Sequence, residues 1–369
     1  MSARTYKGNR KPGGLGDRIN HISHFDVNVS DLERSRAFYE ATMPLEAVER
    51  ISARQAFPSL GIGDGHFEGY VMRSTTQLGD YPAIHLIEWK TPKPVGTPYR
   101  SHGNVGWYRI VPVVRDMERA RAAAIAHGAQ PFAPTTHAEN HMWGPDVPPS
   151  VYRVFMAHDP DGIAIEWGYD WPRARLESSA GEASAEADRE YWLPADPPLR
   201  DRVITVASQS TDVDTNLAFY TDVLGLDILA GAQAREPVPN VYSPGGGMTA
   251  FDGVLFVPRG DRRFFLDWLR WDCSPDNPTP YLEPNHLGIM RCAFEVDDAD
   301  EAYRILADTR FNGRPIANLH PPEIWDLGPA LGRRRVVNFT DPEGVAFQLI
   351  EEPDYPMGRL HPWGRNSFA

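Results

Sequence analysis

The chain has 369 residues, which suits two or three domains of ordinary size. Its formal net charge of -13 argues against a nucleic-acid partner, and no apolar run approaches the ~18 residues that a membrane-spanning helix needs. Only two cysteines, Cys273 and Cys292, are present, so no disulfide framework is implied and a reducing cytoplasm is the expected location.

The first predicted elements are a strand and a helix. Residues 19–29 alternate between apolar and polar side chains, which predicts a strand with one buried face and one polar face. Ser30 and Glu33 then have the spacing of a capping box, which predicts a helix that ends near Met43.

The rest of the first half continues this order and then repeats it. The pattern is that of a β-α-β-β-β unit used twice, with a proline-rich hinge between the two units. Strands are predicted near residues 45–51, 67–73, 83–89, 105–114, 131, 152–157 and 163–168, with the hinge at 91–98 and a second helix that begins at Asp116.

Changes in composition divide the chain into five parts. Residues 1–18 are basic and rich in glycine without an apolar segment, so they are expected to form a flexible tail and not a signal peptide. Residues 19–170 form a first predicted domain, and 171–199 are rich in Ser, Ala, Glu and Pro, as is typical of a linker. A second domain is predicted over 200–352, followed by a C-terminal tail over 353–369.

The two predicted domains are copies of one another. The segment 27–39 matches 208–220 without a gap, including an Ala-Phe-Tyr sequence in the predicted helix. Further along, Asp159-Pro160-Asp161-Gly162 returns as Asp341-Pro342-Glu343-Gly344 at nearly the same offset. Each of these turns combines a proline that presets φ with a glycine that accepts positive φ. Equivalent positions can therefore be compared between the two halves.

These features resemble the vicinal oxygen chelate superfamily of glyoxalases, bleomycin resistance proteins and extradiol dioxygenases. The residues that carry the resemblance are His24, the Ala37-Phe38-Tyr39 segment, and the Asp159–Gly162 turn followed by Glu166. The resemblance implies an α+β fold of two tandem domains, each made of two βαβββ units that form a cupped mixed sheet. It does not specify the reaction, because this scaffold supports many chemistries.

In the superfamily, metal ligands project into the cup from the first, fourth, fifth and eighth strands. The first, fourth and eighth positions here are His24, His85 and Glu166, so the resemblance implies that these three residues bind a divalent metal. Two histidines and one carboxylate form a facial triad with open positions, which favours Fe(II) and also suits Mn, Co, Ni or Zn.

The fifth-strand position departs from the family because it is Arg109, which cannot bind a metal. Two interpretations stay open. Either Arg109 points past the ion and binds a substrate carboxylate or enolate, or it pairs with Glu166 inside a metal-free cup.

The second half lacks the triad. Its matching positions are Thr205, Asp267, Arg291 and Gln348, which suggests an Asp267–Arg291 pair in a cup without a metal. Because His24, His85 and Glu166 have no counterparts there, the comparison favours a site in the first half.

The other candidate residues surround the predicted first cup. The alternative interpretation of His141 is a solvated loop histidine. The alternative interpretation of Asp26 and Asn28 is that they are hydrogen-bond partners of the metal ligands. The assigned roles are catalytic for Arg109, His141 and Tyr152, and substrate binding for Asp26, Asn28, Trp89 and Trp143.

Three functions fit this sequence. The first is a metal-dependent, dioxygenase-like enzyme for a small oxygenated aromatic or keto–enol substrate, although Met156 stands where catechol-cleaving relatives carry a tyrosine. The second is a glyoxalase-type lyase or isomerase that stabilises an enolate. The third is a small-molecule binding protein without chemistry. A homo-oligomer is compatible with each of them.

Overall fold

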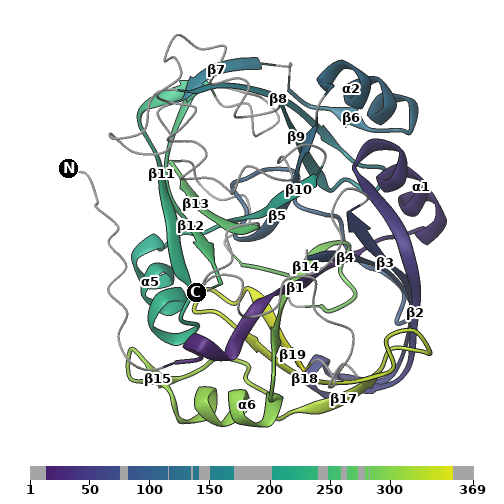
Figure 1. Cartoon of the computed structure of the whole chain (residues 1–369), viewed down its shortest axis with the longest axis vertical. Helices are drawn as coiled ribbons and strands as arrows, with labels where there is room; N and C mark the ends of the chain where they lie inside the picture. Colours follow the sequence, from purple (N-terminus) through teal and green to yellow (C-terminus); the bar gives the residue numbers. More distant parts are fainter. Residues whose placement is uncertain are drawn as a thin grey trace, which may run out of the picture.

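The computed structural model describes residues 14–74, 82–114, 116–133, 136–140, 150–169, 202–239, 248–258, 264–272, 279–281 and 283–351. These residues form two large curled sheets with helices packed against them (Figure 1). No helix among them is long and apolar enough to cross a membrane.

One sheet, called the terminal sheet here, combines strands from the first and the last part of the chain. Its two four-stranded halves meet where β1 pairs antiparallel with β14. In order across the sheet the strands are β17 (Glu323–Asp326), β18 (Arg333–Thr340), β19 (Ala346–Glu351), β14 (Gly288–Val296), β1 (Ile19–Asn28), β4 (Ala83–Thr91), β3 (Ile62–Ser74) and β2 (Leu45–Phe57).

The other sheet, called the middle sheet, is built from the two central units in the same way. Its halves meet where β10 pairs antiparallel with β5. In order across the sheet the strands are β11 (Asp227–Pro239), β12 (Met248–Val257), β13 (Phe265–Trp271), β10 (Arg202–Gln209), β5 (Gly106–Val114), β9 (Ala164–Tyr169), β8 (Ser150–His158) and β6 (Gln130–Pro131), with β7 (Thr136–Asn140) also on β8.

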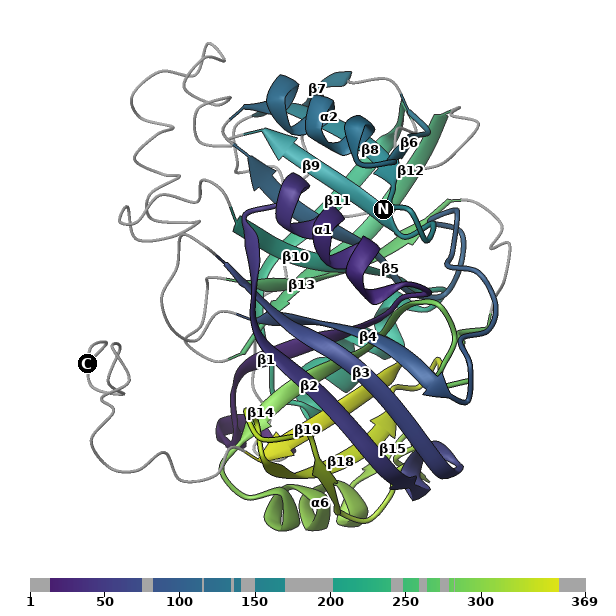
Figure 2. The same ribbon diagram turned by 90° about the vertical axis from the view of Figure 1, so that its right-hand side faces the viewer.

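The α+β class and the two cupped sheets, each made of two units, are confirmed. The units do not pair in chain order, however. The first unit pairs with the fourth, and the second pairs with the third, so neither half of the chain closes a sheet by itself (Figure 2). Within its own unit, the first strand has one edge without a hydrogen-bonded neighbour. The first strand of any other unit can pair with that edge.

Each α-helix of the described chain begins at an aspartate whose side chain accepts a hydrogen bond from the third residue of the helix. At the first helix this residue is Asp31, so the prediction that Ser30 is the cap was wrong by one position. The helices are α1 (Leu32–Thr42), α2 (Met117–Ala126), α5 (Val213–Ala218) and α6 (Ala299–Asp308), and α5 continues into a π-helical turn over Phe219–Val223.

The repeated Asp-Pro-x-Gly turns fasten neighbouring units together. Asp161 accepts hydrogen bonds from Oγ of Ser30 and of Ser35, at the start of α1. In the second half, the Glu343 carboxylate accepts a hydrogen bond from the backbone N–H of Thr211 at 2.7 Å. The motif that reveals the repeat therefore joins the first unit to the second and the third to the fourth.

Aromatic side chains from all four units meet at one indole ring in the core. The ring of Trp107 on β5 lies 5.3 Å from Phe25, 5.2 Å from Trp268 and 5.5 Å from Phe347, measured between centroids. These three partners come from the first, third and fourth units, and all four rings are buried. Such edge-on aromatic contacts contribute about 1 kcal/mol each beyond the burial of their area.

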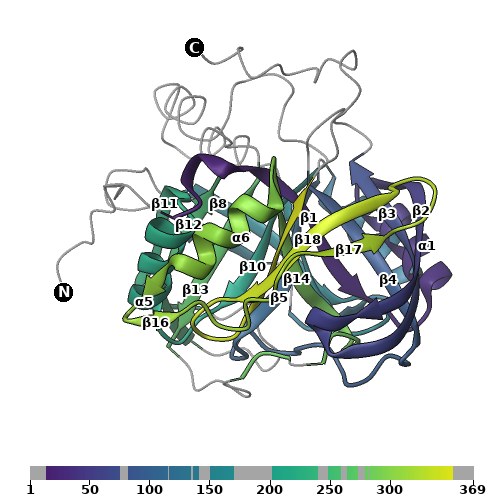
Figure 3. The same ribbon diagram turned by 90° about the horizontal axis from the view of Figure 1, so that it is seen from below.

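The terminal sheet curls until its two edges approach one another (Figure 3). Gln55 of β2 joins them, because its amide nitrogen donates to the carbonyl of Ile324 at 2.9 Å and its oxygen accepts from the backbone of Asp326 at 2.8 Å. The concave side of this sheet, called the terminal cup, is therefore walled on most sides. The concave side of the middle sheet is called the middle cup.

Candidate metal centre in the terminal cup

The structure separates the predicted metal ligands. His24 on β1 and His85 on β4 lie in the terminal cup, whereas Glu166 lies on β9 of the middle sheet. The Nε atom of Arg109 is 2.6 Å from a carboxylate oxygen of Glu166, and both side chains are buried. The three residues of the predicted triad thus do not meet, and the alternative Arg109–Glu166 ion pair is what the structure contains.

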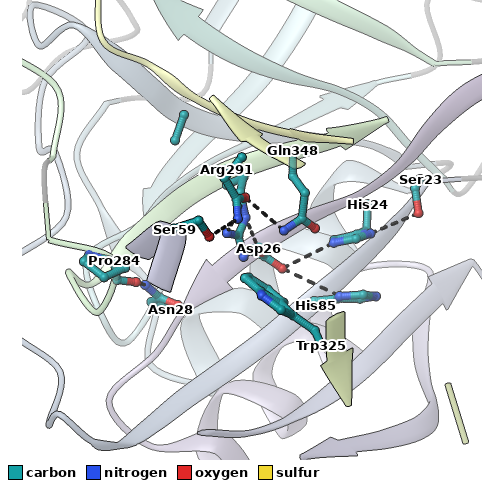
Figure 4. Close-up of polar contacts among 12 residues, drawn as sticks. Ser23, His24, Asp26, Asn28, Ser59, His85, Pro284, Arg291, Trp325 and Gln348 are labelled. Carbon is teal, nitrogen blue, oxygen red and sulfur yellow. Dashed lines mark hydrogen bonds and ion pairs between the residues drawn. The ribbon is translucent and has the colours of Figure 1, made fainter. Parts of the chain in front are cut away.

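A different carboxylate completes a set of three potential ligands. Asp26 Oδ1 lies 3.5 Å from Nε2 of His24 and 3.6 Å from Nδ1 of His85 (Figure 4). The three ligand atoms lie within 4.8 Å of one another, and all three side chains are buried. Within the described residues, this is the group of histidine, cysteine and acidic side chains that has the spacing of a metal site.

The sequence brings these residues together by strand geometry. Side chains two positions apart on a strand share a face, so His24 and Asp26 both point into the cup. Strand β4 runs parallel to β1 with His85 beside Asp26 in the register. The alternation of residues 19–29 predicted the polar face that carries His24 and Asp26. Asp26 was assigned to substrate binding, however, and not to the metal ligands.

Arg291 of β14 holds the other oxygen of Asp26. Its Nε donates to Asp26 Oδ2 at 2.7 Å, and its Nη2 contacts the same oxygen. The predicted Asp267–Arg291 pair was wrong, because Asp267 lies in the middle cup at 3.1 Å from Arg109. Asp26 therefore presents Oδ1 to the two imidazoles while Oδ2 stays fixed by the guanidinium.

A hydrogen-bonded network continues from Arg291 toward β17. Its Nη1 donates to Asn338 Oδ1 at 3.1 Å, and the Asn338 amide donates to Ser59 Oγ at 2.7 Å. Gln348 donates to the same Asn338 oxygen at 3.0 Å, and the ring of Trp325 lies 4.8 Å from the guanidinium carbon. Sequence reasoning did not find Ser59, Asn338 or Trp325, since they have no regular spacing from the histidines.

The electrostatics of the cluster favour neutral imidazole and ionised carboxylate. Burial, with a smaller contribution from His85, holds the pKa of His24 well below its usual value, so its nitrogen keeps a free lone pair. Burial alone would raise the pKa of Asp26, but the positive charge of Arg291 and the contact with His85 outweigh it, and the pKa lies well below the ordinary range. These are the protonation states that a metal requires.

This donor set fits a divalent ion. Metal–nitrogen and metal–oxygen bonds of about 2.1 Å place two ligands at right angles about 3.0 Å apart, so the two His–Asp separations exceed that spacing by only about 0.5 Å. The imidazole rings are stacked, with 3.8 Å between centroids and 16° between planes. Because an imidazole binds a metal in the plane of its ring, binding requires the two rings to turn apart.

A cavity of about 270 Å³ is lined by Asp26 of the cluster, and its lining includes neither His24 nor His85. It is close to the lower end of the volumes typical of small-molecule sites, about 300 Å³. Its lining includes the polar residues Asp26, Arg291 and Asn338 and aromatic residues such as Phe67 and Trp89. The cavity therefore has both polar and apolar lining.

The other predicted site residues divide into two groups. Asn28 and Trp89 line this cavity, and the Asn28 amide also donates to the carbonyls of Pro284 and His286 at 2.8 Å each. Tyr152 lies on β8, but its side chain is outside the described residues, as are His141 and Trp143.

The middle cup holds a buried arginine between two acids. Arg109 contacts both Glu166 and Asp267. Burial raises the pKa of Glu166 to about 7, partly offset by Arg109 and reinforced by Asp267, and burial raises the pKa of Asp267 to about 6. The positions that match His24 and His85 are Thr205 and Asp267, so this cup has neither histidine of the terminal cup.

Comparison with known families agrees with this architecture. The family model of the Glyoxalase/Bleomycin resistance protein/Dioxygenase superfamily matches residues 18–167 and 202–349. The chain belongs to this superfamily, which includes metal-dependent glyoxalases and dioxygenases. A comparison with curated protein sequences finds no match.

Two solved structures of one enzyme share the fold. Glyoxalase I from Zea mays is 15% identical with a TM-score of 0.51, and a point mutant of the same enzyme is 15% identical with a TM-score of 0.54. Each alignment covers 90% of this chain and 92% of the other chain. A putative dioxygenase from Bacillus subtilis is 14% identical with a TM-score of 0.48, covering 91% and 86%. At such identities the likeness concerns the fold alone.

Proposed function

We propose that this protein is a divalent-metal-dependent enzyme whose centre is His24, Asp26 and His85 in the terminal cup. The observation that carries the proposal is the approach of three buried donor atoms to within 4.8 Å of one another, from two adjacent strands of one cup. Glu166 is replaced by Asp26 in this ligand set, and Arg291 takes the place that sequence reasoning gave to Arg109.

The ligand chemistry favours a dioxygenase-like enzyme for a small oxygenated aromatic or keto–enol substrate. Two imidazoles and one carboxylate form the donor set of non-haem Fe(II) oxygenases, which leaves open positions for substrate and O2. Mn, Co, Ni and Zn remain alternatives for the same donors. A bound ion would polarise a substrate oxygen and, as Fe(II), would supply electrons for O2 chemistry.

The protein side chains have separate tasks in this proposal. Asp26 offsets part of the ion's charge, and Arg291 fixes its orientation through Oδ2. Trp89 and Phe67 form part of the apolar lining of the cavity. The cavity volume of about 270 Å³ restricts the substrate to a small molecule.

Metal analysis of the purified protein tests the metal centre. Wild type should hold close to one equivalent of a transition metal after loading, whereas His24→Ala and His85→Ala should hold almost none. Thr205→Ala, at the position that matches His24 in the middle cup, is the control and should retain the metal. A wild-type protein that takes up no metal would instead support a binding protein without chemistry.

Oxygen consumption then separates two reactions. The anaerobically Fe(II)-loaded protein should consume O2 with a catechol or a keto acid if it is an oxygenase. The alternative is a glyoxalase-type isomerase or lyase, which the use of a ligand on the fourth strand, His85, favours. Turnover with Ni or Zn that does not depend on O2 would select this alternative.

A further inference from the structure

We infer that Ser23 is a positioning residue for the proposed metal centre, because its hydroxyl oxygen accepts the Nδ1–H of His24 and leaves the lone pair of Nε2 free to bind the ion. The inference rests on the proposed function, since it names the group that orients one of the proposed ligands. Its basis is the distance of 3.0 Å between Ser23 Oγ and His24 Nδ1 (Figure 4).

A β-bulge in β1 brings the serine beside the histidine. Ile22 pairs with Phe294 of β14, and His24, two positions on, pairs with the adjacent residue Ala293. Ser23 is therefore an extra residue in β1 that has no partner position on β14. A bulge of this kind changes the direction in which the side chains around it point.

The packing of the core shows the same change in alternation. Ile22 and Phe25 both lie in the hydrophobic core, although they are three positions apart. In a regular strand they would face opposite sides of the sheet. The two residues between them, Ser23 and His24, therefore both point away from the core, which explains why their side chains meet.

The two ring nitrogens of His24 have different surroundings. Nδ1 is within hydrogen-bonding distance of Ser23, whereas Nε2 lies 3.5 Å from Asp26 Oδ1, which is longer than an ordinary N–H···O bond. A neutral imidazole has one N–H and one nitrogen with a lone pair. The tautomer with the proton on Nδ1 therefore makes a hydrogen bond to Ser23 and presents the Nε2 lone pair on the side of Asp26. His85 presents its Nδ1 to the same aspartate oxygen at 3.6 Å.

The middle cup has the same bulge without this hydroxyl. Val203 and Val206 of β10 both lie in the core, three positions apart, and the register with β5 shifts between Val203 and Thr205. The residues between the two valines are Ile204 and Thr205, in place of Ser23 and His24. A serine is thus not needed to form the bulge, and in these two strands it occurs only beside the histidine.

Titration calorimetry of the metal-free protein with Zn²⁺ tests the hydrogen bond. Ser23→Ala removes the acceptor and should weaken Zn²⁺ binding by about 10-fold, whereas Ser23→Thr keeps a hydroxyl and should bind as the wild type does. Ser52→Ala is the control, because Ser52 is also a half-buried serine of the terminal sheet. Its neighbours Ile51 and Ala53 belong to the buried cluster of the lining residue Trp89, so its own side chain points away from the cup and the affinity should not change.

Nitrogen NMR of the histidine rings reports the tautomer directly, because protonated, lone-pair and metal-bound ring nitrogens differ strongly in chemical shift. The His24 signals are assigned by their loss in His24→Gln. In the metal-free wild type the proton should lie on Nδ1, and Ser23→Ala should shift the population toward Nε2–H. In the Zn²⁺-loaded wild type the Nδ1–H should remain, with the ion on Nε2.

Three results would overturn the inference and leave the metal centre intact. They are equal Zn²⁺ affinity of Ser23→Ala and the wild type, binding of Zn²⁺ through His24 Nδ1, and a Ser23→Thr variant as weak as Ser23→Ala, which would attribute the loss to packing. Failure of the wild type to take up Zn²⁺ would instead contradict the proposed function. The tautomer of the metal-free protein would then still decide whether Ser23 orients the ring.

Discussion

The terminal and middle cups have the same scaffold and an arginine at the same position, Arg291 in the first and Arg109 in the second. The charge of each arginine is neutralised in a different way. Arg291 lies beside Asp26 of the neighbouring first strand, whereas Arg109 lies beside Ala207 in the same register. Without an acid on that strand, Arg109 pairs with Glu166 and Asp267 from the outer strands.

This difference is the basis for placing the proposed metal in the terminal cup. In the terminal cup, Asp26 satisfies the arginine with one oxygen and offers the other to two imidazoles. In the middle cup, both acids at family ligand positions are committed to the arginine. The cup with Asp26 on its first strand has no acid at the ligand positions of the fourth and eighth strands, His85 and Gln348, whereas the cup with Ala207 has two acids there.

Removal of the acid in each cup should give unequal losses of stability. Asp26→Ala leaves Arg291 buried without a carboxylate, which should cost about 3–5 kcal/mol of unfolding free energy in urea denaturation. Glu166→Ala should cost less, about 1–2 kcal/mol, because Arg109 keeps Asp267. Equal losses in the two variants would contradict this account of the arginines.

Removal of an imidazole should affect metal binding only in the terminal cup. His85→Ala should weaken metal affinity by more than about 100-fold, since it removes a direct ligand. Asp267→Asn changes the matching position of the middle cup and should leave the affinity unchanged. Isothermal titration of the apoprotein with a divalent ion measures both. Loss of affinity in Asp267→Asn would place an ion in the middle cup.

Replacement of each arginine by lysine tests the same difference between the two cups, with a smaller expected change in metal affinity. Arg291→Lys should lower metal affinity about 10-fold, because an ammonium group cannot make the two parallel contacts that orient Asp26. Arg109→Lys should leave it unchanged. If the two variants have the same affinity, Arg291 has no positioning role.

The smallest expected effect is a pH dependence that arises in the middle cup. Burial raises the pKa of Glu166 to about 7, so between about pH 5 and 7 the folded chain holds a proton that the unfolded chain has released. The unfolding free energy should therefore fall as pH rises through this window. Glu166→Gln should reduce the slope.

Urea denaturation at several pH values measures that slope. The terminal cup already carries Gln348 at the matching position and contributes no such dependence there. Glu46→Gln on an exposed position of β2 is the control and should retain the wild-type slope. An unchanged slope in Glu166→Gln would show that Glu166 is ionised throughout this range.

Several features of the site could be predicted from the sequence. Alternation placed His24 and Asp26 on one face of β1, and the family position of His85 indicated the adjacent strand. The Arg109–Glu166 ion pair was an explicit alternative and is present. Asn338 and Ser59 were not predictable, because they reach the site only through the curl of the terminal sheet.

The sequence by itself determined the unit, its four copies and the polar face of the first strand of the chain, because these depend on local alternation, capping and turns. Only the tertiary structure decided which units share a sheet, and hence that Glu166 lies apart from His24. The physical reason is that all four first strands present equivalent backbone edges. The rings that meet at Trp107 come from units far apart in the chain, and such long-range packing cannot be inferred from local sequence patterns.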